Sequence, residues 1–499
     1  MPVKQDQLMW DQLIKLSPES RTTLQHQMRE ALVAAILNGQ IPLDRALPSS
    51  REMAKRLGIA RNTVVLSYQN LVDDGYLCTK ERSGYFVNKQ ILEGRVKSDQ
   101  MVVLQTELSP DWISRYKRQP SKQRNIVKPC DWRKYKYPFI YGQPDQSQFP
   151  INEWRECCRQ SLNVADICSS GYDRFDLDDP ILVEQIQTRL LPRRGVWAKP
   201  EEILVTLGAQ HALYLIANLL TDRTSTVGVE NPGYPDARNI FSVMRSRVIP
   251  LDIDKDGIVP AEALDECDCV YVTPSHQSPT TVTMPIERRK ALLDRAVKSD
   301  FVFIEDDYES ETNFIGDPTP ALKSLDQCDR VIYVGSLSKT LAPGLRLGYM
   351  VGPVDLIREV RALRRLMIRH PPANNQRTIA LFLARGHLDS LLLRQGEIYR
   401  DRWHAMGEAL AEYMPETYQL PTFGGSAFWI EGDKRLDAVE LQNVARKSGV
   451  LIEPGEVYFS KRNPPRNYFR LGYASIPTER IEPGIRLLSE LIRQQLESK

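Results

Sequence analysis

Between residues 203 and 351, short apolar segments rich in β-branched residues alternate with segments that have the periodicity of amphipathic helices. This alternation constrains the fold strongly, because it predicts an α/β domain with a mostly parallel central sheet. In such a sheet, ligands bind at the carboxyl ends of the strands. We expect strands at residues 203–206, 227–229, 247–251, 270–273, 301–305, 331–335 and 348–351, and helices at residues 209–220 and 286–297.

A lysine lies just after one of these strands. Lys339 ends the sequence Gly-Ser-Leu-Ser-Lys, which begins at the last residue of the expected strand 331–335. Burial at such a position lowers the pKa of an amine and frees it to form a Schiff base. Taken alone, a lysine in this setting is more often a solvated loop residue. Hydroxyl and guanidinium groups nearby could hold a phosphate, namely those of Ser336, Ser338 and Arg346.

Acidic and aromatic residues follow the neighbouring strands. Asp306 comes at the end of the expected strand 301–305, where a buried carboxylate requires a cation such as a protonated pyridine nitrogen. Tyr308, two residues on, could reach a hydroxyl on the same ring, and Tyr234 could stack on the ring face. The free backbone N–H groups of a helix beginning after residue 206 could hold a phosphate. That helix start consists of Gly208, Ala209 and Gln210.

An arginine interrupts the apolar segment near the C-terminus. Arg470 lies within residues 467–473, and a buried guanidinium requires a carboxylate partner. A structural salt bridge would serve, and so would the carboxylate of an effector. Together, the lysine, the ring acid, the aromatic residues, the phosphate-binding groups and this arginine predict a site for pyridoxal 5′-phosphate (PLP).

The first ninety residues have a different pattern. Helices are expected at residues 22–37, 51–57 and 61–72, and Gly58 separates the last two, which is the spacing of a helix-turn-helix. Two short strands follow as a wing that includes Gly84. The second helix of such a unit lies in the major groove, although a structural helical hairpin would have the same pattern. Candidate contacts to bases or phosphates are Arg61, Asn62 and Thr63, and candidate contacts to backbone phosphates are Ser49, Ser50 and Arg51.

The charge distribution supports a local nucleic-acid surface rather than a global one. The chain has a net charge of only +2 over 499 residues, whereas residues 21–90 hold ten Lys and Arg against six Asp and Glu. Residues 113–136 hold nine Lys and Arg against one acid. A segment of this kind is usually a solvated linker, and beside a DNA reader it could also touch phosphates nonspecifically. We expect a DNA-binding domain at residues 18–88, a basic linker at 89–136 and a PLP-binding effector domain at 137–499.

Other features bear on location and metal binding. The eight cysteines lack regular C-x-x-C spacing, so we expect reduced thiols and no metal site. The sequence contains no run of 18 apolar residues, and the N-terminus lacks the apolar segment of a signal peptide. We therefore expect a cytoplasmic protein that is neither secreted nor embedded in a membrane.

Two regions resemble known families. The sequence LPSSREMAKRLGIARNTVVLSYQNLVDDGYL, followed by RSGYFV, resembles the winged helix-turn-helix of the GntR superfamily of bacterial transcription factors. Residues 136–495 resemble the fold-type I aminotransferases, and the fusion resembles the MocR subfamily of PLP-binding regulators. The matching pieces are YGQPDQSQFPINEW, TLGAQHAL, ENPGY, TPSHQSPT, IEDDYESE, GSLSKTLAPGLRLGY and YFRLGYAS.

The resemblance implies an aminotransferase-like domain with a smaller C-terminal α+β subdomain. It assigns the Schiff base with PLP to Lys339, the contact with the pyridine nitrogen to Asp306 and the effector carboxylate to Arg470. It also assigns Tyr308 to the ring hydroxyl and Tyr234 to stacking, and places His276 in a loop beside the ring. The phosphate is assigned to Gly208, Ala209, Gln210, Ser336, Ser338 and Arg346.

Two stretches depart from the aminotransferase pattern. Thr281 stands where the pattern S-H-Q-x-P-T-G has glycine, so the loop could have a different shape. Residues 178–183 replace a glycine and a Leu-Arg pair in a region that often helps the site of the neighbouring subunit.

Two functions remain open from the sequence. In the first, the protein is a transcriptional regulator that uses its aminotransferase-like domain as a sensor. An amine or amino-acid effector displaces Lys339, forms an external aldimine and alters the binding of double-stranded DNA. In the second, it is an active aminotransferase with an accessory DNA-binding domain. The presence of Lys339, Asp306 and Tyr308 argues against an aminotransferase-like domain that has lost its cofactor. The resemblance and the long linker favour a homodimer, in which domains could be swapped.

Overall fold

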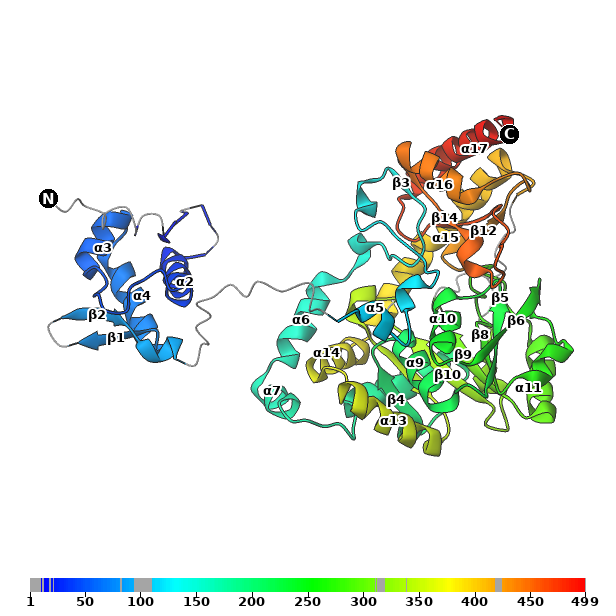
Figure 1. Cartoon of the computed structure of the whole chain (residues 1–499), viewed down its shortest axis with the longest axis horizontal. Helices are drawn as coiled ribbons and strands as arrows, with labels where there is room; N and C mark the ends of the chain where they lie inside the picture. The colour runs from blue at the N-terminus through cyan, green and yellow to red at the C-terminus, as the bar shows by residue number, and fades with distance from the viewer. Residues whose placement is uncertain are drawn as a thin grey trace. The chain divides into compact units, whose positions relative to one another are not determined.

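The protein divides into two compact units, residues 1–114 and 115–499 (Figure 1). The computed structural model describes residues 10, 13–17, 19–20, 22–80, 83–93, 110–309, 311, 319–337, 339–417 and 424–498. Among the helices of these described ranges, none has both the length and the apolar character needed to cross a membrane.

The N-terminal unit is a three-helix arrangement followed by a β-hairpin. Its elements are α2 (Leu24–Leu37), α3 (Ser50–Leu57), α4 (Arg61–Asp73), β1 (Leu77–Lys80) and the antiparallel β2 (Gly84–Val87). Gly58 ends α3 with a left-handed φ of 66°, which turns the chain into α4. The expected helix-turn-helix and its wing are therefore present.

A small apolar core holds this unit together. Met28, Leu32 and Leu71 are fully buried in it, because they occur at helical spacing on the inner faces of α2 and α4. The hydroxyl of Tyr68 donates a hydrogen bond to the carbonyl of Pro48 at 3.0 Å, which ties α4 to the turn before α3.

The larger unit is built on an eight-stranded sheet with the order β4-β11-β10-β9-β8-β5-β6-β7. The strands are β4 (Ile203–Thr206), β5 (Thr226–Asn231), β6 (Arg247–Asp254), β7 (Gly257–Ile258), β8 (Cys269–Val272), β9 (Val302–Asp307), β10 (Val331–Ser336) and β11 (Gly348–Val351). Strand β11 runs antiparallel to both of its neighbours, and β7 runs antiparallel to β6. The other pairs are parallel, as the alternation of strands and helices predicted.

Helices bury both faces of this sheet. Successive residues of β4 show this, because Leu204 packs with α9, α10 and α13 whereas Val205 packs with α8 and α14. Helix α11 covers the second face at β8 and β9. The bounds of these helices are α8 (Pro180–Gln185), α9 (Ala209–Leu220), α10 (Pro235–Val243), α11 (Ile286–Ser299), α13 (Val354–Ile368) and α14 (Ala373–Ala384).

A smaller α+β part contains the C-terminus. Its three-stranded sheet has the order β12-β15-β14, and β13 pairs with β3 in a separate two-stranded sheet. Its elements are β3 (Tyr137–Pro138), β12 (Ala427–Glu431), β13 (Val450–Leu451), β14 (Glu453–Pro454), β15 (Tyr468–Gly472), α15 (His387–Tyr413), α16 (Ala438–Lys447) and α17 (Ile481–Glu497). The other α-helices of the described residues are α5 (Trp112–Arg115), α6 (Ile151–Ser161), α7 (Val164–Ser170) and α12 (Leu322–Leu325).

One predicted site residue, Asp306, lies inside a strand in the structure instead of after it. Strands β4 and β11 and helix α9 have the bounds predicted from the sequence, whereas β9 continues to Asp307. Asp306 is therefore paired within the sheet, opposite Val334 of β10, instead of following the strand. Its backbone is consequently fixed by the hydrogen bonds of the sheet.

Candidate functional site

A cavity of about 290 Å³ lies where the strands of the large sheet end. It is lined by residues from both the large sheet and the smaller α+β part. Most of the residues predicted to bind PLP or its effector are among them: Ala209, Gln210, Tyr234, Asp306, Tyr308, Ser336, Lys339, Arg346 and Arg470. The cavity is therefore the candidate site, and the predicted Ser338 lies outside the described residues.

The amine of Lys339 is held beside an aromatic ring. Its Nζ lies 4.2 Å from the ring centre of Tyr141, over the ring face. Burial and, after it, the nearby ammonium of Lys128 lower the pKa of Lys339 to about 7. A large fraction of this amine is thus neutral near pH 7, which is the form that attacks an aldehyde.

A glycine makes room for this amine. Gly142 has a φ of +71°, and a Cβ added there would overlap Nζ of Lys339. The left-handed φ favours glycine here, and a Cβ at this position would displace the end of the Lys339 side chain.

Of the three acids at the end of β9, Asp306 is the one that lines the cavity described above. The carboxylate of Glu305 accepts hydrogen bonds from the backbone N–H groups of Leu322 and Lys323, at 2.7 and 2.8 Å. Asp307 accepts from Arg194 and Tyr333, at 2.7 and 2.8 Å. These two acids are accordingly structural.

Asp306 has the arrangement expected of a partner for a ring nitrogen. Its Oδ2 accepts a hydrogen bond from the hydroxyl of Tyr271 at 2.9 Å. Its Oδ1 is buried and has no hydrogen-bond partner among the described residues. Burial raises the pKa of Asp306 to about 7, so a cation beside Oδ1 would stabilise the carboxylate. A protonated pyridine nitrogen is such a cation, and the site therefore fits PLP at this position.

The loop that contains His276 lies at the wall of the cavity. The hydroxyl of Tyr308 donates to the backbone carbonyl of His276 at 2.8 Å, and the His276 side chain is 4 % exposed. The residue of this loop that lines the cavity is Ser278. Thr281 adopts a φ of 63°, so this loop retains the left-handed conformation for which glycine is suited.

The predicted phosphate-binding groups gather at the start of α9. Gly208 is the N-cap of this helix and has a φ of 85°. The guanidinium of Arg346 is exposed and donates to the carbonyl of Leu207 at 3.0 Å. An arginine and a helix N-terminus together form a suitable environment for a phosphate dianion.

Tyr234 lies close to this end of the cavity. Its hydroxyl donates to Asp236 at 3.1 Å, and Gln210 donates to the same hydroxyl at 3.3 Å. These bonds fix the ring at the edge of the cavity. Its predicted stacking on the cofactor remains a prediction.

Arg470 could form a structural salt bridge or bind the carboxylate of an effector, and its geometry allows both roles. Its Nε and Nη2 donate to Oε2 of Glu453, at 3.0 and 2.9 Å, in a buried salt bridge. The same guanidinium lies 3.7 Å from the ring centre of Tyr141 and lines the cavity. The bonds to Glu453 do not engage Nη1, so the structure is compatible with a ligand contact as well.

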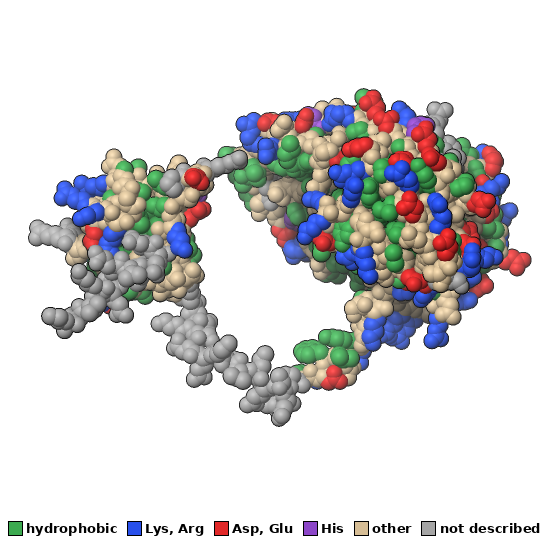
Figure 2. Space-filling view, turned by 90° about the horizontal axis from the view of Figure 1, so that it is seen from above, with side chains coloured by type: hydrophobic (Ala, Val, Ile, Leu, Met, Phe, Trp, Pro, Cys, Tyr) green, Lys and Arg blue, Asp and Glu red, His purple; other side chains and the backbone are tan. Residues whose placement is uncertain are grey.

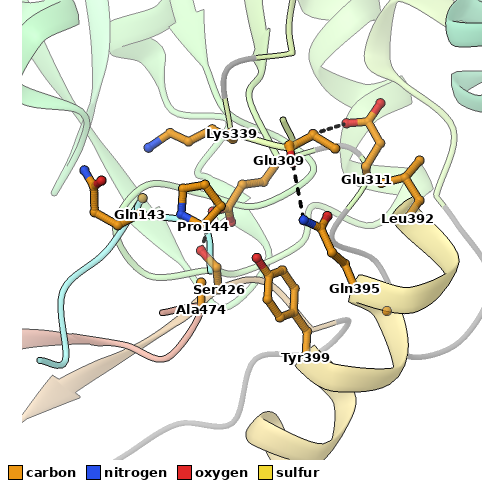
Figure 3. A pocket seen from close by; sticks show the side chains of 13 residues that line it. Gln143, Pro144, Glu309, Glu311, Lys339, Leu392, Gln395, Tyr399, Ser426 and Ala474 are labelled. Carbon is orange, nitrogen blue, oxygen red and sulfur yellow. Dashed lines mark hydrogen bonds between the residues drawn. The ribbon is translucent and has the colours of Figure 1, made fainter. Parts of the chain in front are cut away.

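A second, smaller cavity adjoins the first at Lys339 (Figure 3). Figure 3 shows Lys339 across this space from Gln395 and Tyr399, which extend from helix α15. Glu309 also borders it and accepts a hydrogen bond from Ser426. The lysine therefore borders two connected spaces, one of which has an acidic wall.

Several residues of the site had not been singled out from the sequence. Tyr271 could have been found from its position in a strand beside β9. Tyr141, Gln143 and Glu309 lie in the matching pieces YGQPDQSQFPINEW and IEDDYESE. Lys128 and Glu453 have no local signal, because they are distant from each other in the chain.

The departure at residues 178–183 has a structural role. The buried Asp178 forms ion pairs with Arg364 at 2.6 Å and with Arg361 at 2.8 Å. It also accepts a hydrogen bond from the backbone N–H of Val205 at 3.2 Å. Asp178 thus connects α13 to the edge strand β4.

The N-terminal unit presents its own candidate surface. Arg61 and Asn62 are exposed at the start of α4, and the Nε of Arg61 donates to the hydroxyl of Ser50 at 3.4 Å. The hydroxyl of Ser49 caps α3 by accepting from the N–H of Glu52 at 3.3 Å. Figure 2 shows Lys and Arg side chains on the surface of this unit. The remaining predicted DNA contacts are the exposed Arg51, the half-buried Thr63 and the exposed Gly84.

Family models match both units. Residues 144–488 match the model for aminotransferase class I and II, and residues 24–87 match the model for bacterial regulatory proteins of the gntR family. These matches confirm the predicted fold class, a winged helix-turn-helix joined to a fold-type I aminotransferase-like domain.

Individual relatives combine the same two parts. The chain is 40 % identical over 478 residues to the HTH-type transcriptional regulator TauR of Rhodobacter capsulatus, covering 96 % of this chain and 98 % of that protein. It is 29 % identical over 481 residues to the probable rhizopine catabolism regulatory protein MocR of Rhizobium meliloti, covering 95 % of each chain.

Solved aminotransferase structures share the fold of the larger unit. One is LysN, the α-aminoadipate aminotransferase of Thermus thermophilus complexed with N-(5′-phosphopyridoxyl)-L-leucine. It is 27 % identical with a TM-score of 0.70, covering 78 % of this chain and 100 % of that one. Another is a kynurenine aminotransferase of Pyrococcus horikoshii, 28 % identical with a TM-score of 0.68, covering 77 % of this chain and 98 % of that one.

Proposed function

The chain belongs to the MocR-type branch of the GntR family of bacterial transcriptional regulators, and on this basis we propose that an amine or amino-acid effector controls its binding to double-stranded DNA. Its larger unit belongs to the aminotransferase class I and II family, which uses PLP. The observation that carries the proposal is the pair of Lys339 and Asp306 in one cavity of a chain that also contains a winged helix-turn-helix.

The residues of the cavity support a specific placement of the cofactor. Oδ1 of Asp306 would hold the pyridine nitrogen, and Ser336, Arg346 and the start of α9 would hold the phosphate. The amine of Lys339 would then lie beside the aldehyde. When bound, PLP supplies this aldehyde, which reacts reversibly with primary amines.

Control of DNA binding requires that the effector distinguish two states of the protein. An effector shifts a conformational equilibrium only by the difference in its affinity for the two conformers. The neutral amine of Lys339 and an incoming amine compete for the same aldehyde, so the effector changes the contacts of Lys339. We propose that this exchange is the event to which the DNA-binding unit responds.

The organisation of the protein in the cell follows from the same proposal. We propose a DNA-binding domain at residues 18–88, a linker at 89–136 and an effector domain at 137–499. We also propose that the protein is a homodimer in the cytoplasm. Apolar side chains exposed on and after α7 support a dimer, because a second copy would bury them. They are Val164 (80 % exposed), Tyr172 (69 %) and Leu177 (62 %).

A second function is favoured by one observation. One relative is named an aminotransferase: the aromatic-amino-acid aminotransferase 1 of Thermococcus litoralis is 31 % identical over 306 residues, covering 59 % of this chain and 73 % of that protein. The lowered pKa of Lys339 is compatible with turnover. The alternative is therefore an active aminotransferase with an accessory DNA-binding domain.

Gel-shift titrations test the proposal. The PLP-loaded full-length protein is titrated onto duplex DNA from upstream of its own gene, with and without a panel of primary amines. We expect sequence-specific binding whose affinity changes with at least one amine. Equal affinity for random duplex would refute a sequence-specific regulator, and steady transamination of amino acids would favour the alternative.

A further inference from the structure

The segment of residues 122–128, here called the docked segment, connects two parts of the larger unit. Gln123 donates to the backbone carbonyl of Asn239 at 3.0 Å, and the Asn239 side chain donates in return to the carbonyl of Arg124 at 3.0 Å. Arg124 donates to the carbonyl of Phe459 at 2.8 Å. The docked segment is thus bonded to α10 beside the large sheet and to the loop before β15, although its sequence resembles that of a solvated linker.

The docked segment ends inside the candidate site. The ammonium of Lys128 donates to the carbonyl of Tyr141 and forms an ion pair with Glu453 at 3.4 Å. Its Nζ lies 5.4 Å from the ring centre of Tyr141, which also has Lys339 and Arg470 over it. Lys128 lines the same cavity as these two residues.

Two cationic side chains contact one carboxylate at this end of the cavity. Glu453 is bound by two cations, Arg470 and Lys128, and one carboxylate neutralises only one of them. The other nearby acid, Glu309, borders the smaller cavity beside Lys339 and accepts from Ser426. Lys128 and Arg470 thus share the carboxylate of Glu453, and Glu309 also attracts Lys128 electrostatically. Burial lowers the pKa of Lys128.

We propose that Lys128 is an effector-recognition residue, which forms with Arg470 a two-cation site for the anionic group of an amino-acid effector. This inference deepens the proposed function and rests on it for the amine as ligand. Nη1 of Arg470, which the bonds to Glu453 leave unengaged, and the ammonium of Lys128 are the donors. Charge-assisted bonds of this kind discriminate strongly against a ligand without the anion.

Paired ligands test the role of Lys128. The probes are ω-amino acids from glycine to 5-aminopentanoate, each paired with the alkyl amine in which a methyl group replaces the carboxylate. Binding to the PLP-loaded full-length protein is followed by the absorbance of the cofactor. We expect the wild type to prefer the acid in at least one pair, and Lys128→Met to weaken that acid by roughly 10-fold or more relative to its paired amine.

Further variants separate recognition from folding. Lys128→Arg should retain the preference, and so should Lys122→Met, which removes an exposed cation of the same segment. Glu453→Gln should strengthen binding of the acid, because the competing carboxylate is removed. A wild type without preference in any pair, an equal loss for acid and amine in Lys128→Met, or weaker acid binding in Glu453→Gln overturns the proposal. Cofactor absorbance and DNA binding without effector report separately on the proposed function.

Discussion

The hydroxyl of Tyr271 donates to Oδ2 of Asp306 at 2.9 Å, and this bond orients the carboxylate with Oδ1 unpartnered among the described residues. The two residues lie on the adjacent parallel strands β8 and β9. The sheet therefore fixes both the carboxylate and the hydroxyl that orients it. The carboxylate is therefore preorganised to bind a cationic ring.

Replacing this carboxylate should weaken cofactor binding. We expect Asp306→Asn to lower the affinity for PLP by about 10- to 100-fold, because a hydrogen bond to a charged group contributes about 1.5–3 kcal/mol. Tyr271→Phe, which leaves the carboxylate in place, should cost less than about 10-fold. Equilibrium dialysis of both variants measures the effect. An affinity of Asp306→Asn equal to that of the wild type would contradict the assigned contact.

The pKa of Lys339 predicts how cofactor capture depends on pH. The amine is protonated and unreactive below its pKa of about 7 and is neutral above it. The rate at which the PLP-free protein captures PLP should therefore rise with pH through about 7, instead of through the ordinary lysine pKa of about 10.4. Stopped-flow absorbance from pH 5.5 to 9 measures this rate, and Lys339→Ala should lack the signal.

A variant of Lys128 identifies which group titrates. The ammonium of Lys128 is the second cause of the lowered pKa of Lys339, after burial. Lys128→Met should consequently move the midpoint of the rate profile to higher pH. Asp306 also has a pKa of about 7, but Lys128 is not among the groups that shift it. An unchanged midpoint would assign the profile to Asp306.

The start of α4 should determine DNA affinity. Arg61 is exposed there, and its guanidinium is held by Ser50. We expect Arg61→Ala to weaken binding by roughly 10-fold and to reduce the salt slope by about one, because one phosphate or base contact is lost. Gel shifts at several salt concentrations measure both quantities. Arg358→Ala, which removes an exposed charge from α13, is the control and should have no effect.

The left-handed backbone conformation at Thr281 should lower the stability of the folded protein. A β-branched residue at a φ of 63° is strained. Thr281→Gly removes this strain, but glycine also has a larger conformational entropy in the unfolded chain. The net effect should be an increase of about 1 kcal/mol or less in the free energy of unfolding. Denaturant unfolding of the PLP-free protein measures the change. Thr280→Gly is the matched control and should destabilise, because glycine lacks the hydroxyl with which Thr280 donates to Oε1 of Gln277 at 2.6 Å. A loss of stability in Thr281→Gly would show that the threonine side chain outweighs the strain.

The sequence was sufficient for the parts of the site that depend on local order. Lys339 and Asp306 could be predicted because each lies at the end of an apolar strand, where a polar side chain faces a ligand. Gly58 could be predicted because a helix that ends in a left-handed residue favours glycine. In all three cases the relevant neighbours are within a few residues along the chain.

Contacts between distant segments could not be predicted in this way. The ion pair of Lys128 with Glu453 joins residues more than three hundred positions apart, and neither residue has a local pattern that indicates a partner. The course of the loop that contains His276 determines which of its residues reaches the cavity, and Ser278 lines it. Periodicity determines which face of an element is buried and does not determine which other element covers it.

A substitution at Gly142 could separate DNA binding from the response to the effector in living cells. An alanine there would add a methyl group that overlaps Nζ of Lys339, on a backbone at φ +71°. The winged helix-turn-helix belongs to the other compact unit and should fold unaltered. A strain carrying Gly142→Ala would then keep the promoter reader while losing its response to amines. Transcripts that change in this strain and not in a deletion strain would define the genes that the unliganded regulator controls.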